Sequence, residues 1–284
     1  MNIKNQILIT GGTGTTGSRI AKKLIERGYK PRIASRKNPL GTEIDHVYFD
    51  WYDETTHNLA LENINKLYLV APVGVIDPSP IVLPFIELAL KKGVKRIVLL
   101  SSSLVDEGGP VFGKIHQAVR EKAPEWAVLQ PSYFMQNFIG IQHGYSIKAN
   151  KEIVTATQDG KVGFVDADDI AEVGVNALID EIPHNTNHLI TGPEALSYTD
   201  AANIIGSVIG ESIHHVPIST STLQDKMLEA GMTRDYAEFM VGLEKEIQKG
   251  TENRITNTVE RITGRKPRSL GEFATIHAHF WKQT

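Results

Sequence analysis

The chain has 284 residues, of which 41% are hydrophobic and 22% charged, and its formal net charge at pH 7 is −3. This length allows one large domain or a domain with a satellite lobe, and without a basic excess no nucleic-acid or anionic-membrane partner is expected. Because the chain has no cysteine, disulfides, a thiolate nucleophile and cysteine-based metal sites are excluded. No apolar run reaches the roughly eighteen residues of a membrane span, so we expect a soluble, cytoplasmic protein.

Apolar runs alternate with helical patterns in the first half of the chain. Strands are predicted at residues 6–10, 31–35, 46–50, 66–72, 96–103 and 126–132, and helices at 17–28 and 81–93. Strands that alternate with helices are typical of βαβ units and a parallel sheet, and right-handed crossovers make the sheet doubly wound. The expected fold class is therefore α/β, with a Rossmann-type parallel sheet and a small C-terminal substrate lobe.

The alternation becomes less regular after residue 132. Helical patterns follow at 166–180, 198–210 and 222–250, and the segment 188–194 could rejoin the sheet. We expect residues 1–132, with returning segments near 166–194, to form the nucleotide-binding core. Residues 133–165 and 195–284 are expected to form the substrate lobe within the same structural unit.

The segment TGGTGTTGSR, residues 10–19, places three evenly spaced glycines between a predicted strand and a predicted helix. In dinucleotide-binding loops of this kind, one glycine permits a tight turn, the next lets a pyrophosphate approach the backbone, and the third lets helix and strand pack closely. The helix N-terminus adds free N–H groups. A tight turn without a ligand is the alternative. The residues predicted to surround the pyrophosphate are Gly11, Thr13, Gly14, Thr15, Thr16 and Gly17.

The second predicted strand ends in ASRKN, residues 34–38, and no acidic residue occurs between Glu26 and Glu43. A carboxylate in this region would bind the ribose 2′-OH of NAD. Ser35 and Arg36 are instead suited to a 2′-phosphate. The sequence therefore favours NADP(H) over NAD(H), and a solvated basic turn is the alternative.

Two further strand ends are predicted to contact the cofactor. Asp50, at the end of the third predicted strand, is placed to meet the adenine amino group, although a surface turn explains it nearly as well. Ala71 and Pro72, at the end of the fourth, complete this part of the predicted site.

The segment PSYFMQNF, residues 131–138, follows the sixth predicted strand at the sheet edge where nicotinamide and substrate should lie. Tyr133 is the favoured functional side chain, as a hydrogen-bond donor or a cation–π partner. Phe134 and Asn137 are predicted to contact substrate, and a purely structural role is the alternative for Phe134. No metal site is predicted, because no H-E-x-x-H motif occurs and the histidine near-pairs lack a carboxylate at ligand spacing.

Several segments carry a likeness to a known family, namely TGGTGTTGSRIAKKLIERG, ASRKN, GVKRIVLLSS, WAVLQPSYFMQNF and GFVDADDIA. With them the chain resembles the NmrA-like group of atypical short-chain dehydrogenase/reductases over nearly its whole length. EGGPVFGKIHQ and ITGRKPRSLGEFA are similar to the branch that contains festuclavine and agroclavine dehydrogenases, whereas triphenylmethane-dye and azo reductases are more distant.

The resemblance implies a reductase that transfers a hydride from NAD(P)H to a small organic electrophile, such as an iminium ion, a quinone or a dye-like compound. It also implies that Ser101 and Ser102, at the end of the fifth predicted strand, lie near the nicotinamide. The alternative is a non-catalytic NADP(H)-binding sensor, as some NmrA-like proteins are. An isomerase or epimerase on the same fold is a weaker third possibility.

The chain departs from most short-chain dehydrogenases at their Tyr-x-x-x-Lys pair, in which the phenol protonates the carbonyl oxygen. Phe112 stands here four residues before His116, and phenylalanine cannot donate a proton. Hydride transfer to a cationic carbon needs no proton, so a site without this pair could act by positioning alone. Tyr133 and His116 remain the candidate catalytic residues.

Overall fold

The computed structural model describes residues 6–38 and 45–282, which form two compact units. Unit 1 contains the described residues up to Pro131 together with Ile170–Leu189. Unit 2 contains Ser132–Asp169 and the described residues from Ile190 onwards. No helix among the described residues is both long and apolar enough to cross a bilayer.

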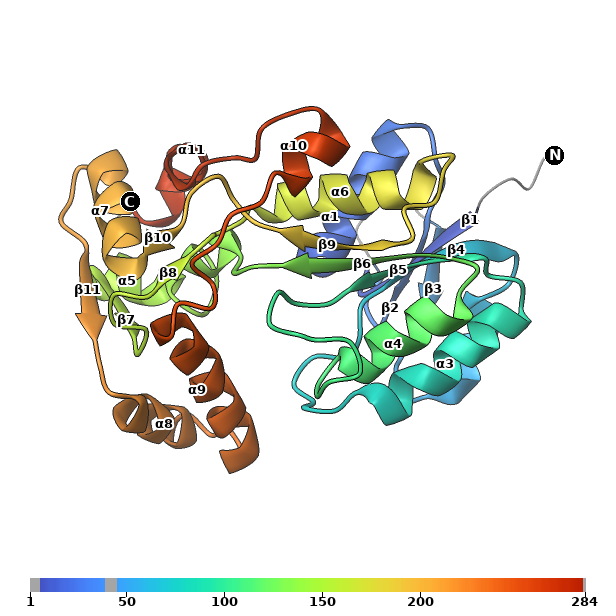
Figure 1. Cartoon of the computed structure of the whole chain (residues 1–284), viewed down its shortest axis with the longest axis horizontal. Coiled ribbons are helices and arrows are strands. Elements are labelled where there is room, and N and C mark those ends of the chain that lie inside the picture. The colour runs from blue at the N-terminus through green and yellow to red at the C-terminus, as the bar shows by residue number, and fades with distance from the viewer. Residues whose placement is uncertain (1–5, 39–44, 283–284) are drawn as a thin grey trace. The chain divides into compact units, whose positions relative to one another are not determined.

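Unit 1 is built on a seven-stranded sheet with the order β3-β2-β1-β4-β5-β6-β9 (Figure 1). Parallel pairing joins each neighbouring pair from β3 to β6. The strands are β1 Gln6–Thr10, β2 Arg32–Ser35, β3 Asp45–Tyr48, β4 Ile64–Leu69, β5 Arg96–Leu100, β6 Glu125–Pro131 and β9 Thr186–Ile190. This confirms the predicted α/β class with a doubly wound parallel sheet, and β9 confirms that the chain returns to it.

Helices cover both faces of this sheet. Figure 1 shows α1 (Thr15–Glu26) and α6 (Ala167–Ile179) on one face and α3 (Ser79–Lys91) and α4 (Gly113–Lys122) on the other. The strands are apolar because both faces are covered: Ile7, Leu8 and Ile9 of β1 are all fully buried. The strand order reverses between the neighbouring strands β1 and β4, because β2 and β3 lie on one side of β1 and β4 lies on the other. Doubly wound sheets bind ligands at the carboxyl ends of the two strands where the order reverses.

Unit 2 is mainly helical and has two small sheets, an antiparallel pair of β10 with β8 and a parallel pair of β11 with β7. Its core contains the fully buried Phe138, Phe273 and Trp281. Its elements are α5 Gly144–Asn150, β7 Glu152–Thr155, β8 Lys161–Val162, β10 Leu196–Ser197, α7 Tyr198–Ile209, β11 His214–Pro217, α8 Thr220–Glu229, α9 Arg234–Gln248, α10 Thr258–Thr263 and α11 Leu270–His277.

Some element boundaries differ from the predicted ones for local reasons. The first helix begins at Thr15 because extended Gly14 forms its N-cap. The third strand ends at Tyr48, before Asp50, whose backbone carbonyl accepts hydrogen bonds from side chains of the following turn. The helical pattern within 222–250 corresponds to two helices, α8 and α9, which are separated at Gly231, where φ is +87°.

Candidate functional site

The loop between β1 and α1 is a tight turn next to the point where strand order reverses. Gly11 has φ +61°, and its carbonyl oxygen accepts a hydrogen bond from the Gly14 N–H at 2.8 Å. A Cβ on Gly17 would lie 2.4 Å from the Gly11 carbonyl oxygen, and a Cβ on Gly12 would lie 2.6 Å from Cγ2 of Ile33 in β2. Gly12 therefore has a packing role that the motif of glycines at every third residue did not predict.

The start of α1 is open. Thr13, Gly14 and Thr15 are exposed, no side chain of the described residues caps the helix, and its first turn has no acidic residue. A Cβ on Gly14 would have one neighbour within 4 Å, the Gly11 carbonyl oxygen at 3.1 Å. These backbone N–H groups and the open space beside Gly14 fit an anionic group such as a phosphate.

Thr16 differs from its neighbours because it is buried. Its hydroxyl accepts a hydrogen bond from the phenol of buried Tyr68 in β4 at 3.0 Å. The sequence predicts that this hydroxyl faces the pyrophosphate, but in the structure it connects α1 to the sheet instead.

Ser35 and Arg36, at the end of β2, face different surroundings. The buried Ser35 hydroxyl donates to the Lys37 carbonyl oxygen at 2.6 Å and lies 3.2 Å from Nε2 of His46. Arg36 is exposed and makes no hydrogen bond or ion pair within the described residues. Ser35 thus shapes the turn, whereas Arg36 leaves its guanidinium available to a ligand.

Asp50 accepts hydrogen bonds that stabilise a turn. Its Oδ1 accepts a hydrogen bond from the Tyr52 N–H at 3.0 Å, and its carbonyl oxygen accepts one from Nε2 of His57 at 3.0 Å. This is the geometry expected of the surface-turn alternative. Ala71 and Pro72 are buried just after β4.

Ser101 and Ser102 directly follow β5. The Ser101 N–H donates to the Leu129 carbonyl oxygen at 2.8 Å, while its buried hydroxyl has no partner within the described part of the chain. The Ser102 hydroxyl accepts a hydrogen bond from the Leu104 N–H at 3.5 Å. A buried hydroxyl without a partner is uncommon, so Ser101 is the one of the pair that fits a ligand-binding role.

His116 is enclosed in unit 1. Phe112 forms the N-cap of α4, and His116 is 1% exposed one turn further along. The His116 Nε2 lies 2.9 Å from the side-chain oxygen of Asn187 in β9. Burial lowers the pKa of this imidazole. His116 therefore connects two elements of unit 1.

The predicted substrate residues lie together in unit 2, just after β6. The Tyr133 carbonyl oxygen accepts a hydrogen bond from the Val165 N–H at 2.9 Å, and its half-buried ring packs against the core of unit 2. Its phenol oxygen is buried and has no partner among the residues that the structure describes. Phe134 and Asn137 follow Tyr133 in the sequence and are also half-buried.

Burial and nearby negative charge both act on the Tyr133 phenol. Burial and the negative charges of Glu252, Glu244 and Glu246 raise the pKa of Tyr133. Buried Glu252 accepts a hydrogen bond from the Ser132 hydroxyl at 2.9 Å and pairs with Arg254 at 2.9 Å.

Glu244, on α9, accepts a hydrogen bond from the Ala156 N–H, and burial raises the pKa of Glu244 to about 7. The sequence pattern did not single out Glu244 as a candidate site residue. The signal was its position: Glu244 shares a helical face with Ala237 and Val241, both buried.

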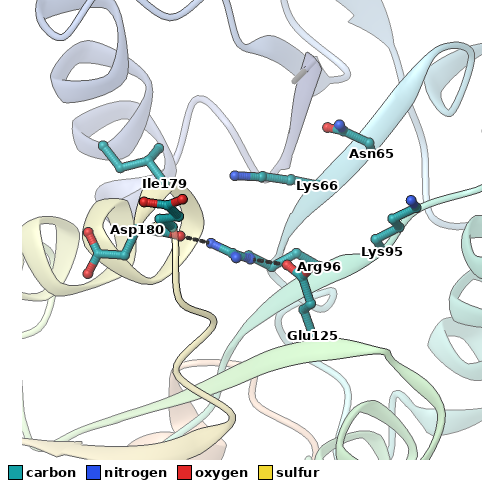
Figure 2. Close-up of a pocket in the computed structure, with 8 residues that line it drawn as sticks. Asn65, Lys66, Lys95, Arg96, Glu125, Ile179 and Asp180 are labelled. Carbon is teal, nitrogen blue, oxygen red and sulfur yellow. Dashed lines mark hydrogen bonds and ion pairs between the residues drawn. The ribbon is translucent and has the colours of Figure 1, made fainter. Parts of the chain in front are cut away.

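A polar cavity of about 450 Å³ lies at the amino ends of β4, β5 and β6, at the opposite edge of the sheet from the glycine loop. Figure 2 shows side chains that line it. Arg96 donates to Glu125 and to the Asp180 carbonyl oxygen, both at 2.6 Å, and Lys66 donates to the Leu178 carbonyl oxygen at 2.7 Å. These cations satisfy the last carbonyl groups of α6. We therefore assign them a structural role. Among the described residues, no three side chains are grouped to hold a metal ion.

The chain is similar to known proteins over nearly all of its length. Residues 85–276 match the model of the NmrA-like family. The chain is 57% identical over 278 residues to the uncharacterized oxidoreductase YesF of Bacillus subtilis strain 168, covering 98% of this chain and 97% of that protein. It is 37% identical over 284 residues to agroclavine dehydrogenase of Claviceps fusiformis, covering 97% and 98%.

Two solved structures share the fold. The NADPH-dependent quinone oxidoreductase of Escherichia coli, complexed with NADPH, has a TM-score of 0.82 at 18% identity, covering 96% of this chain and 100% of that one. The triphenylmethane reductase of Citrobacter, complexed with NADP(H), has a TM-score of 0.80 at 18% identity, with the same coverage.

Proposed function

The chain belongs to the NmrA-like family, and from this premise we propose that it is an NAD(P)H-dependent oxidoreductase. The observation that carries the proposal is the loop at residues 11–17. It combines a tight turn at Gly11, a close helix approach at Gly17 and open backbone at Gly14, at the point where strand order reverses. Ligands bind doubly wound sheets at this point.

In this proposal, residues of unit 1 hold the cofactor. The first N–H groups of α1 bind the pyrophosphate, with Thr13 and Thr15 as further donors. Arg36 binds the 2′-phosphate and makes NADP(H) the preferred cofactor. The Ser101 hydroxyl fits a hydrogen-bonding group of the nicotinamide half, because it is buried and has no partner among the described residues. The bound cofactor supplies a hydride.

Unit 2 is proposed to select the substrate through Tyr133, Phe134 and Asn137. We propose a small organic electrophile, namely an iminium ion, a quinone or a dye-like compound. Two observations favour an electrophile that needs no proton during transfer. Phe112 has no proton to give, and the surroundings of Tyr133 raise its pKa, so its phenol is a weak acid.

The test is a screen of NADPH oxidation with the purified protein against iminium, quinone, azo and triarylmethane compounds. The expected result is turnover of at least one compound by the wild type and none by Gly14→Val. NADPH binding without turnover of any compound would contradict the reductase and favour the sensor.

A further inference from the structure

A cavity of about 330 Å³ in unit 1 is lined by helix α3 and by the segment that joins β3 to β4. In the described structure, its lining contains none of the residues to which the proposed function assigns the cofactor or the substrate. Most of the lining side chains are aromatic, aliphatic or proline, and they include Trp51, Tyr52, Phe85, Pro80 and Pro84. The cavity is therefore suited to the apolar body of a small molecule.

The aromatic wall of this cavity is closely packed. The ring of half-buried Trp51 lies edge-on to buried Phe85, with a centroid distance of 5.1 Å and an interplanar angle of 79°. The ring of His57 lies at the same distance from Phe85, and its Nε2 is 3.0 Å from the Asp50 carbonyl oxygen. These contacts hold the indole in place, so a ligand would meet a preformed aromatic surface.

Tyr52 is 65% exposed although it lines the same cavity. Its side chain makes no hydrogen bond, ion pair or ring contact within the described residues. Its aromatic face is therefore available to a ligand, and such a face attracts cations.

The charge on this side of the cavity is negative. Lysine and arginine are absent from residues 45–65, whereas acidic residues occur throughout, namely Asp45, Asp50, Asp53, Glu54 and Glu62. Glu54 lines the cavity, is exposed and makes no ion pair within the described part of the chain. Among the residues that the structure describes, no lysine or arginine lines the cavity to balance it. This charge distribution is complementary to a cation.

Helix α3 adds a backbone acceptor to the lining. Pro84 lies inside this helix and has no N–H, so it cannot donate the usual helical hydrogen bond to the Pro80 carbonyl oxygen. Both prolines line the cavity. The lining thus combines a backbone carbonyl group with the Glu54 carboxylate, and a protonated amine has several N–H donors for acceptors of these two kinds.

We propose that this cavity is a further binding site of the protein, for a protonated amine that carries an aromatic or other apolar body. The wall formed by Trp51 and Phe85 takes the apolar body, while Tyr52 and Glu54 attract the ammonium group. A neutral analogue loses the attraction of the charge, and an anionic one is repelled by Glu54. Because the site lies outside the proposed cofactor and substrate residues, it does not depend on the reductase function.

The test measures binding of three probes of similar size to the full chain at neutral pH, namely 2-phenylethylammonium, 2-phenylethanol and phenylacetate. In ¹⁵N-labelled protein each tryptophan gives an indole N–H resonance, and Trp51→Phe assigns the resonance of Trp51. The cation should shift this resonance saturably and bind at least about fivefold more tightly than the alcohol, whereas phenylacetate should bind more weakly than both.

Two exposed lining residues can be changed with little effect on the fold. Tyr52→Ala and Glu54→Gln should each weaken binding of the cation about threefold, and the double variant about tenfold, because cation–π and charge contacts at exposed positions are modest. Tyr48→Ala and Glu62→Gln are the matched controls, an exposed tyrosine and an exposed acid of the same region that do not line the cavity. They should leave the affinity for the cation unchanged.

Equal affinities for the cation and the alcohol would overturn the proposal, because the site would then not recognise charge. A Trp51 resonance that does not shift saturably with the cation would also overturn it. A shift that follows protein concentration in the absence of any probe would identify a second copy of the chain as the occupant and would reject the amine. NADPH oxidation plays no part in these measurements, so failure of the reductase proposal is recognised separately.

Discussion

Nε2 of His116 lies 2.9 Å from the side-chain oxygen of Asn187, so this imidazole joins helix α4 to strand β9. Its partner and its burial indicate that it supports the fold of unit 1. We predict that His116→Ala lowers the free energy of unfolding by about 1–3 kcal/mol, because it removes a buried hydrogen bond and leaves a cavity. Urea denaturation measures this loss.

Turnover of His116→Ala should stay within about threefold of wild type at a temperature where the variant is folded. His214→Ala, at an exposed histidine, is the control and should change neither property. A large loss of kcat with unchanged stability would show instead that His116 takes part in the chemistry.

The fold class was predictable because its signals are local. Apolar runs, helical periodicity and the glycine spacing before α1 each depend on neighbouring residues, and together they indicate a doubly wound sheet. The spacing also indicated which loop is suited to a phosphate, since Gly11 and Gly17 have the turn and packing roles that the motif requires.

Side-chain roles were less predictable because they depend on distant partners. Thr16 is occupied by Tyr68, 52 residues away, and Ser35 lies against His46, 11 residues away on the next strand. Neither partner could be assigned before the strand register was known. Glu244 was missed because a carboxylate on a helix is usually solvated, and only the packing of α9 shows that this one is not.

Gly14 and Gly17 should respond differently to the same substitution. Gly14→Val places its side chain in the open space of the loop, so we expect loss of NADPH binding with little change in the melting temperature. Gly17→Val drives its side chain against the backbone of Gly11, 2.4 Å from the new Cβ, so the fold itself should be strongly destabilised. Calorimetry with NADPH and thermal unfolding separate the two effects. Wild-type NADPH affinity in Gly14→Val would refute the phosphate assignment.

Arg36 is predicted to set the cofactor preference. Arg36→Glu replaces a charge-assisted contact with repulsion, so NADPH affinity should fall by about one to two decades while NADH affinity changes little. Titration calorimetry with both cofactors measures the difference. Lys92→Glu makes the same charge change at an exposed position just after α3 and should leave both affinities unchanged. Equal losses for both cofactors in Arg36→Glu would rule out the 2′-phosphate contact.

Glu244 should make stability depend on pH. Burial raises its folded-state pKa from 4.5 to about 7. Between these values the folded state binds more protons than the unfolded state, so this residue lowers stability as pH rises through the window. Glu244→Gln removes the effect and should be more stable than wild type at pH 8 by about 1–3 kcal/mol, with no advantage at pH 4.5. Urea denaturation across this range tests it. An advantage that does not vary with pH would show that the gain has another cause.

The last prediction concerns hydride transfer without a proton donor. Phe112 forms the N-cap of α4, and we propose from the sequence resemblance that it stands in the place of the tyrosine of the acid pair of short-chain dehydrogenases. If the acceptor carbon arrives already positively charged, restoring the hydroxyl with Phe112→Tyr should add little to kcat. Steady-state rates of the variant and the wild type on the same cationic substrate measure this.

The pH profile gives an independent measure of the same chemistry. With a permanently charged substrate, kcat should be nearly flat between about pH 6 and 8, because no enzyme group must give up a proton. Burial lowers the pKa of His116, so this histidine stays neutral over most of that range. Efficient turnover of neutral ketones, with an apparent pKa that disappears in Tyr133→Phe, would make Tyr133 a general acid and overturn the prediction.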